Sequence, residues 1–343
     1  MKNGINHKKQ NLKYIPYHFS ELPKLATEVI GMDILLVAVS PMDKHGYFSF
    51  SLNNDFTSTV ARKCKRVIVE VNPNLPRVYG DSTIHINEID TITENKAPLL
   101  LVPRGSINEK QKAIGQKVAE LIENGSTIQL GIGGISDAIC EGLSQHKDLG
   151  IHTELLSPAM VDLVKKGIVT GTQKTLHKRK SVFTIAMGDA QFCKDLDNNS
   201  TFESYPSSHI NNPYIIGQND NFVSVNSAVE IDFFGNVNAE FLSEHEFSGT
   251  GGHADFVRGS FLSKNGKSII AMTSTTNSGT SKIVPYVQMT TTTKMDVDYI
   301  VTEYGVERLR GKSVHERISA MIRLAHPNHR EKLREIAKKR SIA

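Results

Sequence analysis

One glutamate and a glycine-rich segment form the strongest chemical signal in this chain of 343 residues. Glu240 follows a predicted turn, and the segment SGTGGHADFVRGS, which contains Gly249, Gly251 and Gly252, comes shortly after it. Consecutive glycines leave backbone N–H groups open to an oxyanion or a phosphate. A carboxylate beside such a site can act as a nucleophile. The spacing alone favours a surface glutamate and a structural turn over a catalytic site.

Other common catalytic and cofactor motifs are absent from the sequence. Both GKS tripeptides lack the upstream glycine of a phosphate-binding loop, and both G-x-G-G turns lack the third glycine of a dinucleotide site. Neither a G-x-S-x-G nucleophile elbow nor an H-E-x-x-H zinc motif occurs. His326 and His329 are separated by Pro327 and have no obvious third ligand, so we expect a helix start there and no metal site.

Composition and charge are those of an ordinary folded protein. Lys and Arg number 40 against 36 Asp and Glu, which gives a formal net charge of +4. No stacking aromatic residues interleave with the basic ends, so we expect no nucleic-acid partner. No apolar run approaches the length of a membrane span, so we expect no membrane association and a cytoplasmic location. The widely spaced Cys64, Cys140 and Cys193 predict reduced thiols.

Buried strands and amphipathic helices are expected to alternate, as in α/β proteins. Apolar runs predict strands that are covered on both faces at 33–40, 67–71 and 181–188. The strand-like run STIQL enters a glycine turn at 131–134, and helical spacing resumes in ISDAICEGL. This strand, turn and helix order is the core of an α/β unit.

Three further patterns predict exposure, capping and domain organisation. Residues 223–233 alternate apolar and polar side chains, which predicts a strand with one buried and one polar face. Ser313, followed three residues later by Glu316, predicts a capping box at the start of the last helical stretch. The polar segment 195–213 is rich in Asn, Ser, Asp and Pro and is the candidate connection between two domains.

Longer segments resemble one protein family over nearly the whole chain. They include, in order, YIPYHFSELPKL, VSPMDKHGYFSF, STIQLGIGGISDAI, GIHTELLSPAMVDLVKKGIVTG, SVNSAVEIDFFGNVNAE, SGTGGHADFVRGS, SKIVP and DVDYIVTEYG. These segments resemble the acetyl-CoA hydrolase/transferase family, in its 4-hydroxybutyrate and butyrate:acetate CoA-transferase group of family I CoA-transferases. The resemblance implies two similar open α/β domains of the CoA-transferase type, at 1–205 and 206–343, with the active site in the cleft between them.

The resemblance also implies an activity, which is the movement of CoA between short-chain carboxylic acids, with acetate as donor or acceptor. Glu240, in VNAE, would attack the acyl-CoA thioester and pass through a mixed anhydride to a glutamyl-CoA thioester, with ping-pong kinetics. Backbone N–H groups of Gly249, Gly251 and Gly252 would hold the oxyanions. Glu303, in TEYG, is the rival carboxylate. Coenzyme A is a substrate in this chemistry, and no bound metal or redox cofactor is expected.

Contacts to CoA are expected in the segment IIGQN, which matches a family stretch ahead of the nucleophile. Its residues are Ile215, Ile216, Gly217, Gln218 and Asn219. The amides of the last two suit the neutral pantetheine chain. Arg258, Lys264 and Lys267 could meet the CoA phosphates, although plain surface positions explain them equally well.

Three features depart from the family pattern. Ser136 stands where proline is usual, and His253 stands where glutamine is common, beside the glycine cluster. Only residues 1–13 precede YIPYHFSE, where the family carries a further segment of about two or three βα units. We therefore expect an uncovered edge or apolar face in the N-terminal domain.

Three functions stay open at this point. An acid as acceptor gives a CoA-transferase, whereas water as acceptor gives an acyl-CoA hydrolase that uses the same glutamate. A chain without the opening segment could also be an inactive homologue that only binds acyl-CoA. From the family we expect a homodimer or a higher homo-oligomer.

Overall fold

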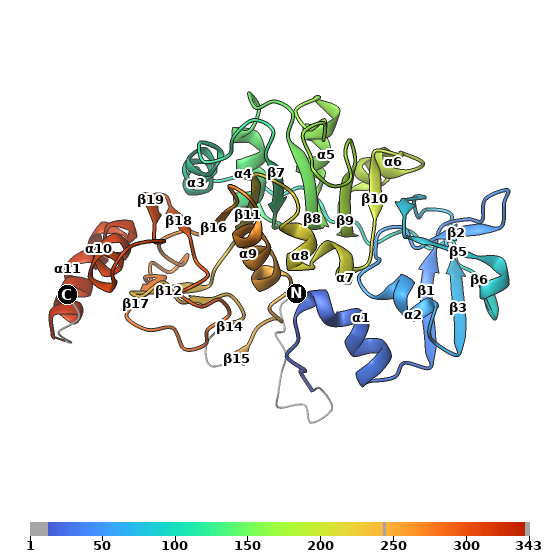
Figure 1. Ribbon diagram of the computed structural model, residues 1–343, viewed down its shortest axis with the longest axis horizontal. Coiled ribbons are helices and arrows are strands. Elements are labelled where there is room, and N and C mark those ends of the chain that lie inside the picture. The colour runs from blue at the N-terminus through green and yellow to red at the C-terminus, as the bar shows by residue number, and fades with distance from the viewer. Residues whose placement is uncertain (1–12, 243–244, 340–343) are drawn as a thin grey trace.

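A nine-stranded sheet forms the centre of the molecule (Figure 1). The computed structural model describes residues 13–242 and 245–339. Neighbouring strands in the sheet are parallel except for the antiparallel pair β18 and β19. In spatial order the strands are β19 (Gly305–Arg308), β18 (Tyr299–Thr302), β16 (Lys267–Ala271), β11 (Phe222–Asn226), β7 (Thr127–Leu130), β8 (Gly150–Leu156), β9 (Ser181–Ala186), β10 (Phe202–Ser204) and β4 (Tyr79–Gly80).

Helices cover both faces of this sheet and give three layers (Figure 1). One face packs on α3 (Glu109–Ala119), α4 (Gly134–Gly142), α5 (Pro158–Lys165) and α6 (Ala190–Leu196). The other face packs on α7 (Ser207–Ile210), α8 (Pro213–Ile216) and α9 (His253–Leu262). In β11, Phe222 belongs to one core and Val223 to the other. Successive side chains of a strand point to opposite faces, which is why one strand serves both layers.

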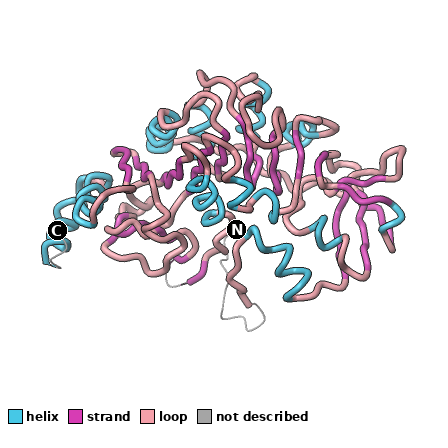
Figure 2. The backbone as a smooth tube through the Cα atoms, viewed as in Figure 1, coloured by secondary structure: helices cyan, strands magenta, loops and turns pink. Residues whose placement is uncertain are grey.

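A second, smaller parallel sheet is formed by the N-terminal part of the chain and lies at the right of Figure 2, apart from the central sheet. It contains β1 (Ile34–Val39), β3 (Arg66–Val71) and β6 (Thr91–Glu94), with β3 in the middle. Helix α2 (Thr57–Ala61) and the antiparallel strand pair β2 (Tyr47–Ser49) and β5 (Thr83–His85) share its core. Ile34 and Leu36, on the edge strand β1, are 58% and 71% exposed. The prediction that the strand at 33–40 is covered on both faces is therefore wrong, because β1 exposes one of its faces. An uncovered edge in the N-terminal domain stays a prediction.

The short helix α1 (Leu22–Lys24) precedes β1 in the chain. The other elements complete the C-terminal half; they are the strands β12 (Glu230–Asp232), β13 (Val237–Asn238), β14 (Phe241–Leu242), β15 (His245–Glu246) and β17 (Ile283–Val284), and the helices α10 (Val314–Leu324) and α11 (Pro327–Lys339). Ser313 caps α10 as predicted, because its hydroxyl accepts the backbone N–H of Glu316, whose carboxylate in turn accepts the backbone N–H of Ser313.

The predicted exposure of residues 223–233 is also wrong. The alternation in 223–233 predicts a strand with a polar face, but β11 has only Asn226 outside the buried class. Ser224 is fully buried, and its hydroxyl lies 3.1 Å from that of Ser260 on α9. The serine pair satisfies both hydroxyls without water, so a polar residue in the pattern marks a helix contact and not a solvated face.

The predicted α/β class is confirmed. Strands on both sides of position 205 enter the same nine-stranded sheet, since β10 ends at Ser204 and β11 begins at Phe222. The division into domains at 205/206, and an active site between two such domains, therefore stay predictions.

Candidate active site

Glu240 lies just beyond β13 and is 9% exposed. One carboxylate oxygen, Oε1, accepts a 3.0 Å hydrogen bond from the Thr291 hydroxyl. The backbone carbonyl of Glu240 accepts the N–H groups of Phe247 and Ser248, which ties it to the start of the glycine-rich loop. Burial raises the pKa of Glu240, and the charge of Glu246 adds to this rise. The residue is thus a buried carboxylate on one side of the loop.

Gly251 and Gly252 bring the loop against a different carboxylate. Gly251 has a φ of +53°, and Gly252 is the N-cap of α9. A Cβ atom on Gly252 would overlap Oε2 of Glu154 and Nδ2 of Asn211. Only glycine fits at 252, because the Glu154 carboxylate occupies the space of a side chain.

Glu154 projects from the central strand β8, two residues before that strand ends. Its Oε2 accepts a 2.6 Å hydrogen bond from Nδ2 of Asn211, which follows α7, and the Gly252 backbone also hydrogen-bonds the carboxylate. Burial raises the pKa of Glu154 to about 7, and the charges of Asp255 and Asp55 contribute to the rise. The residue as a whole has intermediate exposure, while its carboxyl group is largely buried. A carboxylate in this state is close to its ionisation point at neutral pH.

The segment around Tyr14 and Ser20 lies over the same loop. The backbone N–H and hydroxyl of Ser20 both donate to the Asp255 carboxylate at 2.9 Å. Burial raises the pKa of Asp255 to about 6. The Thr250 backbone hydrogen-bonds Tyr14, whose pKa is raised by burial and by the Glu240 charge. The glycine loop therefore lies between Glu154 on one side and Tyr14 with Glu240 on the other.

The predicted CoA-contact segment is largely a packing element. Ile216 and Asn219 are fully buried. The amide oxygen of Asn219 accepts the Leu176 backbone N–H, and its carbonyl accepts the Ser263 hydroxyl. A Cβ on Gly217 would press on Leu262 of α9, so glycine lets α8 approach that helix. Ile215 is partly exposed and Gln218 exposed, and contact of the segment with CoA stays a prediction.

Arg258 and the two predicted lysines lie along and beyond α9. Arg258 is exposed and lies 3.4 Å from Asp296. Lys264 is exposed, whereas Lys267 donates to the Leu121 carbonyl and the Glu123 carboxylate. Lys267 is therefore already engaged, and the phosphate contacts of all three residues stay predictions.

Glu303 is held at the end of β18 by neighbouring donors. Its carboxylate accepts the Ser274 backbone N–H at 2.8 Å and the Ser274 hydroxyl at 2.9 Å, and Lys110 lies 3.8 Å away. The negative charge of Glu303 also acts on Lys282. Burial of this lysine lowers its pKa to about 8. Two cations and one carboxylate thus gather where β16 and β18 end. Ligands of open parallel sheets bind at this edge.

Metal-ligand geometry is not found among residues 13–242 and 245–339, where no group of three or more His, Cys, Asp or Glu side chains could hold an ion. His329 hydrogen-bonds the Gly279 carbonyl at 2.8 Å. In the same part of the chain, no helix has the length and apolar character needed to cross a membrane. The expectations of no metal and no membrane partner stay predictions.

Comparison with known proteins identifies the family. The model of the acetyl-CoA hydrolase/transferase N-terminal domain matches residues 3–103, and that of the C-terminal domain matches residues 188–337. The chain is 45% identical over 332 residues to 4-hydroxybutyrate coenzyme A transferase of Clostridium kluyveri, which covers 95% of this chain and 77% of that relative. The chain belongs to the acetyl-CoA hydrolase/transferase family.

Other members of the acetyl-CoA hydrolase/transferase family agree with this. Succinyl-CoA:cyclohexane-1-carboxylate CoA transferase of Geobacter metallireducens is 43% identical over 330 residues, 95% of this chain and 76% of that relative. The crystal structure of RipA from Yersinia pestis superposes with a TM-score of 0.93 at 44% identity, over 96% of this chain and 76% of that one. The resemblance drawn from the sequence is confirmed.

Sequence reasoning on this acetyl-CoA hydrolase/transferase family member passed over Glu154 and Asn211. A signal for Glu154 was present, because it is the one carboxylate in the strand GIHTELL of the sheet. A charged residue in a strand that is buried on both faces needs a specific partner or a function. No comparable signal marks Asn211, whose role depends on a contact across 57 positions of sequence.

Proposed function

We propose that this chain is a CoA-transferase that exchanges CoA between carboxylic acids, and that Glu154 is the residue that becomes acylated. The supporting observation is the state of its carboxylate. It has a pKa raised to about 7, and it lies against the glycine loop and the Asn211 amide. A raised pKa strengthens a carboxylate as a nucleophile, provided that the group is ionised when it attacks.

The reaction proceeds in two half-reactions that balance without a redox step. Ionised Glu154 attacks the thioester carbon, the carbon–sulfur bond breaks, and an acyl-glutamyl anhydride and CoA thiolate result. The thiolate then attacks the glutamyl carbonyl, the first acid leaves as its carboxylate, and a glutamyl-CoA thioester remains. An acceptor carboxylate reverses both steps. Coenzyme A is a substrate throughout, and the kinetics are ping-pong.

Oxyanion stabilisation follows from the resting hydrogen bonds. When the thiolate attacks the glutamyl carbonyl, negative charge develops on the former carboxylate oxygen of Glu154. Nδ2 of Asn211 and the Gly252 backbone already hydrogen-bond this carboxylate. They would therefore need little rearrangement, and a donor in such a position is typically worth about 3 to 4 kcal/mol. Gly251 lies beside the same carboxylate, whereas Gly249 lies against Tyr14, and the predicted oxyanion contacts of both glycines stay predictions.

Glu240 remains the alternative nucleophile, as the family resemblance implies. Within the described residues, the Thr291 hydroxyl donates a hydrogen bond to the Glu240 carboxylate. The Glu240 carbonyl accepts hydrogen bonds from the start of the glycine loop, and its charge acts on Tyr14 beside that loop. Glu240 can therefore position the loop even when Glu154 forms the covalent bond.

CoA is proposed to lie along the carboxyl edge of the central sheet. The turn at 131–134 follows β7 there, and a cleft of about 640 Å³ opens beside Gly133 and Gly134. Lys110 and Lys282 supply positive charge at the same edge. The neutral pantetheine chain can pair with backbone groups, while phosphates meet the lysines.

Replacement of Lys282 by methionine is expected to raise KM for acyl-CoA about five- to tenfold with little change in kcat, because a phosphate contact contributes equally to substrate and transition state. Steady-state kinetics with acetyl-CoA tests this. Arg258→Ala is the matched comparison, since the sequence predicts that residue as the phosphate contact. If KM rises in Arg258→Ala and not in Lys282→Met, the result would favour CoA binding along residues 215–219.

The dependence of kcat/KM on pH is expected to follow the ionisation of Glu154. Since only the carboxylate attacks and its pKa is about 7, kcat/KM should rise about tenfold per pH unit below 7 and level off above it. Initial rates between pH 5 and pH 9 measure this profile. A profile that is already flat at pH 5.5 would mean that the nucleophile has an ordinary carboxyl pKa.

Hydrolysis is the second candidate activity, because water in place of the acceptor acid would open the same covalent intermediate. Release of CoA from acyl-CoA, measured with and without added acetate, separates the two. A transferase forms acetyl-CoA when acetate is added and releases little CoA without it. CoA release that is independent of acetate indicates a hydrolase. If neither assay shows turnover, the chain would be the inactive homologue that only binds acyl-CoA. Short-chain acids as substrates, a homo-oligomer, a cytoplasmic location and the lack of a nucleic-acid partner stay predictions.

A further inference from the structure

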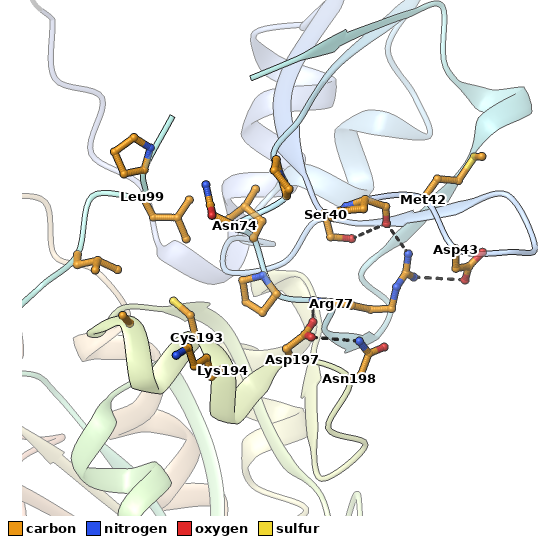
Figure 3. Close-up of a pocket in the computed structure, with 17 residues that line it drawn as sticks. Ser40, Met42, Asp43, Asn74, Arg77, Leu99, Cys193, Lys194, Asp197 and Asn198 are labelled. Carbon is orange, nitrogen blue, oxygen red and sulfur yellow. Dashed lines mark hydrogen bonds and ion pairs between the residues drawn. The ribbon is translucent and has the colours of Figure 1, made fainter. Parts of the chain in front are cut away.

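A second cleft, of about 710 Å³, opens between the small N-terminal sheet and α6 (Figure 3). Ser40 follows β1 and Pro73 follows shortly after β3, so this cleft lies at the carboxyl end of the small parallel sheet. Helix α6 provides the opposite wall through Ala190, Cys193 and Lys194. Position and volume are those of a small-molecule site in an open α/β sheet. None of its lining residues belongs to the group around Glu154.

The walls of this cleft are mostly apolar and stiff. Four proline rings and the side chains of leucine and methionine line it; these are Pro41, Pro73, Pro76, Pro98, Leu75, Leu99, Leu101 and Met42. Proline has a fixed φ and no backbone N–H group, so these walls lose little entropy when a ligand binds and offer few donors. Met42 and Leu101 are 47% and 45% exposed. The walls therefore suit a ligand with an apolar body.

The charged groups of the lining are largely satisfied by one another. Arg77 donates to the carbonyls of Pro41 and Tyr47 and lies 3.4 Å from the Asp43 carboxylate. Asp197 accepts the Arg77 backbone N–H and the Asn198 amide, as Figure 3 shows in part. Over the part of the chain that the structure describes, Lys194 has no ion-pair or hydrogen-bond partner and is the lining cation still free to bind. The unsatisfied charge of the cleft is thus positive.

We propose that this cleft binds an amphiphilic carboxylate, with its apolar chain between the proline walls and its carboxylate on Lys194. A medium-chain fatty acid anion has this chemistry and a suitable volume. Because Arg77 ties the small sheet to the loop after α6 at the floor of the cleft, the ligand would bridge the small sheet and the central one. The proposal does not depend on the transferase reaction, because it concerns a separate set of residues.

The test is isothermal titration calorimetry with decanoate on the wild-type chain and three variants. Lys194→Met keeps the length of the side chain and removes its charge, and is expected to weaken binding about tenfold. Leu101→Trp fills the mouth at an exposed position and is expected to abolish binding. Lys178→Met, which removes an exposed charge outside the cleft, is the control and should bind as the wild type does.

Two results would overturn the proposal. One is the absence of saturable binding in the wild type at millimolar decanoate. The other is equal affinity in the wild type, Lys194→Met and Leu101→Trp, which would place the ligand elsewhere. Circular dichroism of each variant confirms that the fold is retained. Glu154→Gln should still bind decanoate, whereas loss of binding in that variant would assign the acid to the acyl site.

Discussion

Glu154→Gln is expected to lower kcat by about 10⁴-fold or more, because the amide cannot form the acyl-glutamyl anhydride. The substitution preserves the volume of the side chain, and the Gln oxygen can still accept from Asn211 and Gly252. KM for acyl-CoA should therefore change little. Steady-state rates of acetyl-CoA formation measure both constants.

Glu240→Gln is the matched comparison for this loss. If Glu240 only positions the loop, its amide variant should retain activity within about tenfold of the wild type. The reverse pattern, an inactive Glu240→Gln and an active Glu154→Gln, would instead restore the assignment that the family resemblance implies.

Glu154→Gln should also be more stable than the wild type. A purely structural glutamate would not give this result. In the folded chain the pKa of Glu154 is raised from 4.5 to about 7. As pH rises from about 4.5 to 7, the unfolded chain releases this proton first, so the wild type loses stability over that interval. Above pH 7 the loss is complete and amounts to about 3 kcal/mol.

Glutamine has no such ionisation. The free energy of unfolding of Glu154→Gln should therefore exceed that of the wild type at pH 8 and equal it near pH 4. Urea denaturation at both pH values measures the difference. Lower stability of the variant at pH 8 would mean that the charged carboxylate stabilises the fold, contrary to the raised pKa.

Gly252→Ala is expected to lower kcat about 10²- to 10³-fold, comparable to the loss of an oxyanion donor. A Cβ at this position would overlap the carboxylate of Glu154 and the amide of Asn211. Either the nucleophile or the loop must move, so the reacting geometry is lost although the backbone N–H remains. Initial rates, with circular dichroism to confirm folding, check this effect.

Gly249→Ala provides the control within the same loop. A Cβ there meets only the ring of Tyr14, at 3.5 Å or more, which is an ordinary contact. Activity within about threefold of the wild type is expected. Equal losses in both variants would show that the loop tolerates no side chain at all, and would remove the specific link between Gly252 and Glu154.

Much of the fold could be predicted because its pattern is local. The strands β1, β3 and β9 are continuous apolar runs, although of these three only β9 is largely buried, and the capping box of α10 lies within four residues. The exposure of β11 could not be predicted. Its buried Ser224 is paired by Ser260 on α9, and such long-range pairing leaves no trace in a period-two pattern.

The candidate site was predicted only in part, for a related reason. The glycine loop is visible in sequence, since consecutive glycines are a local signal. Which carboxylate faces it depends on the packing of β8, α7 and α9, which brings Glu154, Asn211 and Gly252 together from distant segments. Both glutamates lie near the loop in space, Glu240 through its backbone carbonyl and Glu154 through its side chain.

Trapping of the covalent intermediate tests the central claim most directly. The protein is incubated with acetyl-CoA and reduced with borohydride, which converts a glutamyl thioester into an alcohol, and its peptides are analysed by mass spectrometry. The account predicts that Glu154 loses its carboxylate and that Glu240 is unchanged. Reduction at Glu240, or an unmodified Glu154 in protein that turns over acyl-CoA, would contradict it.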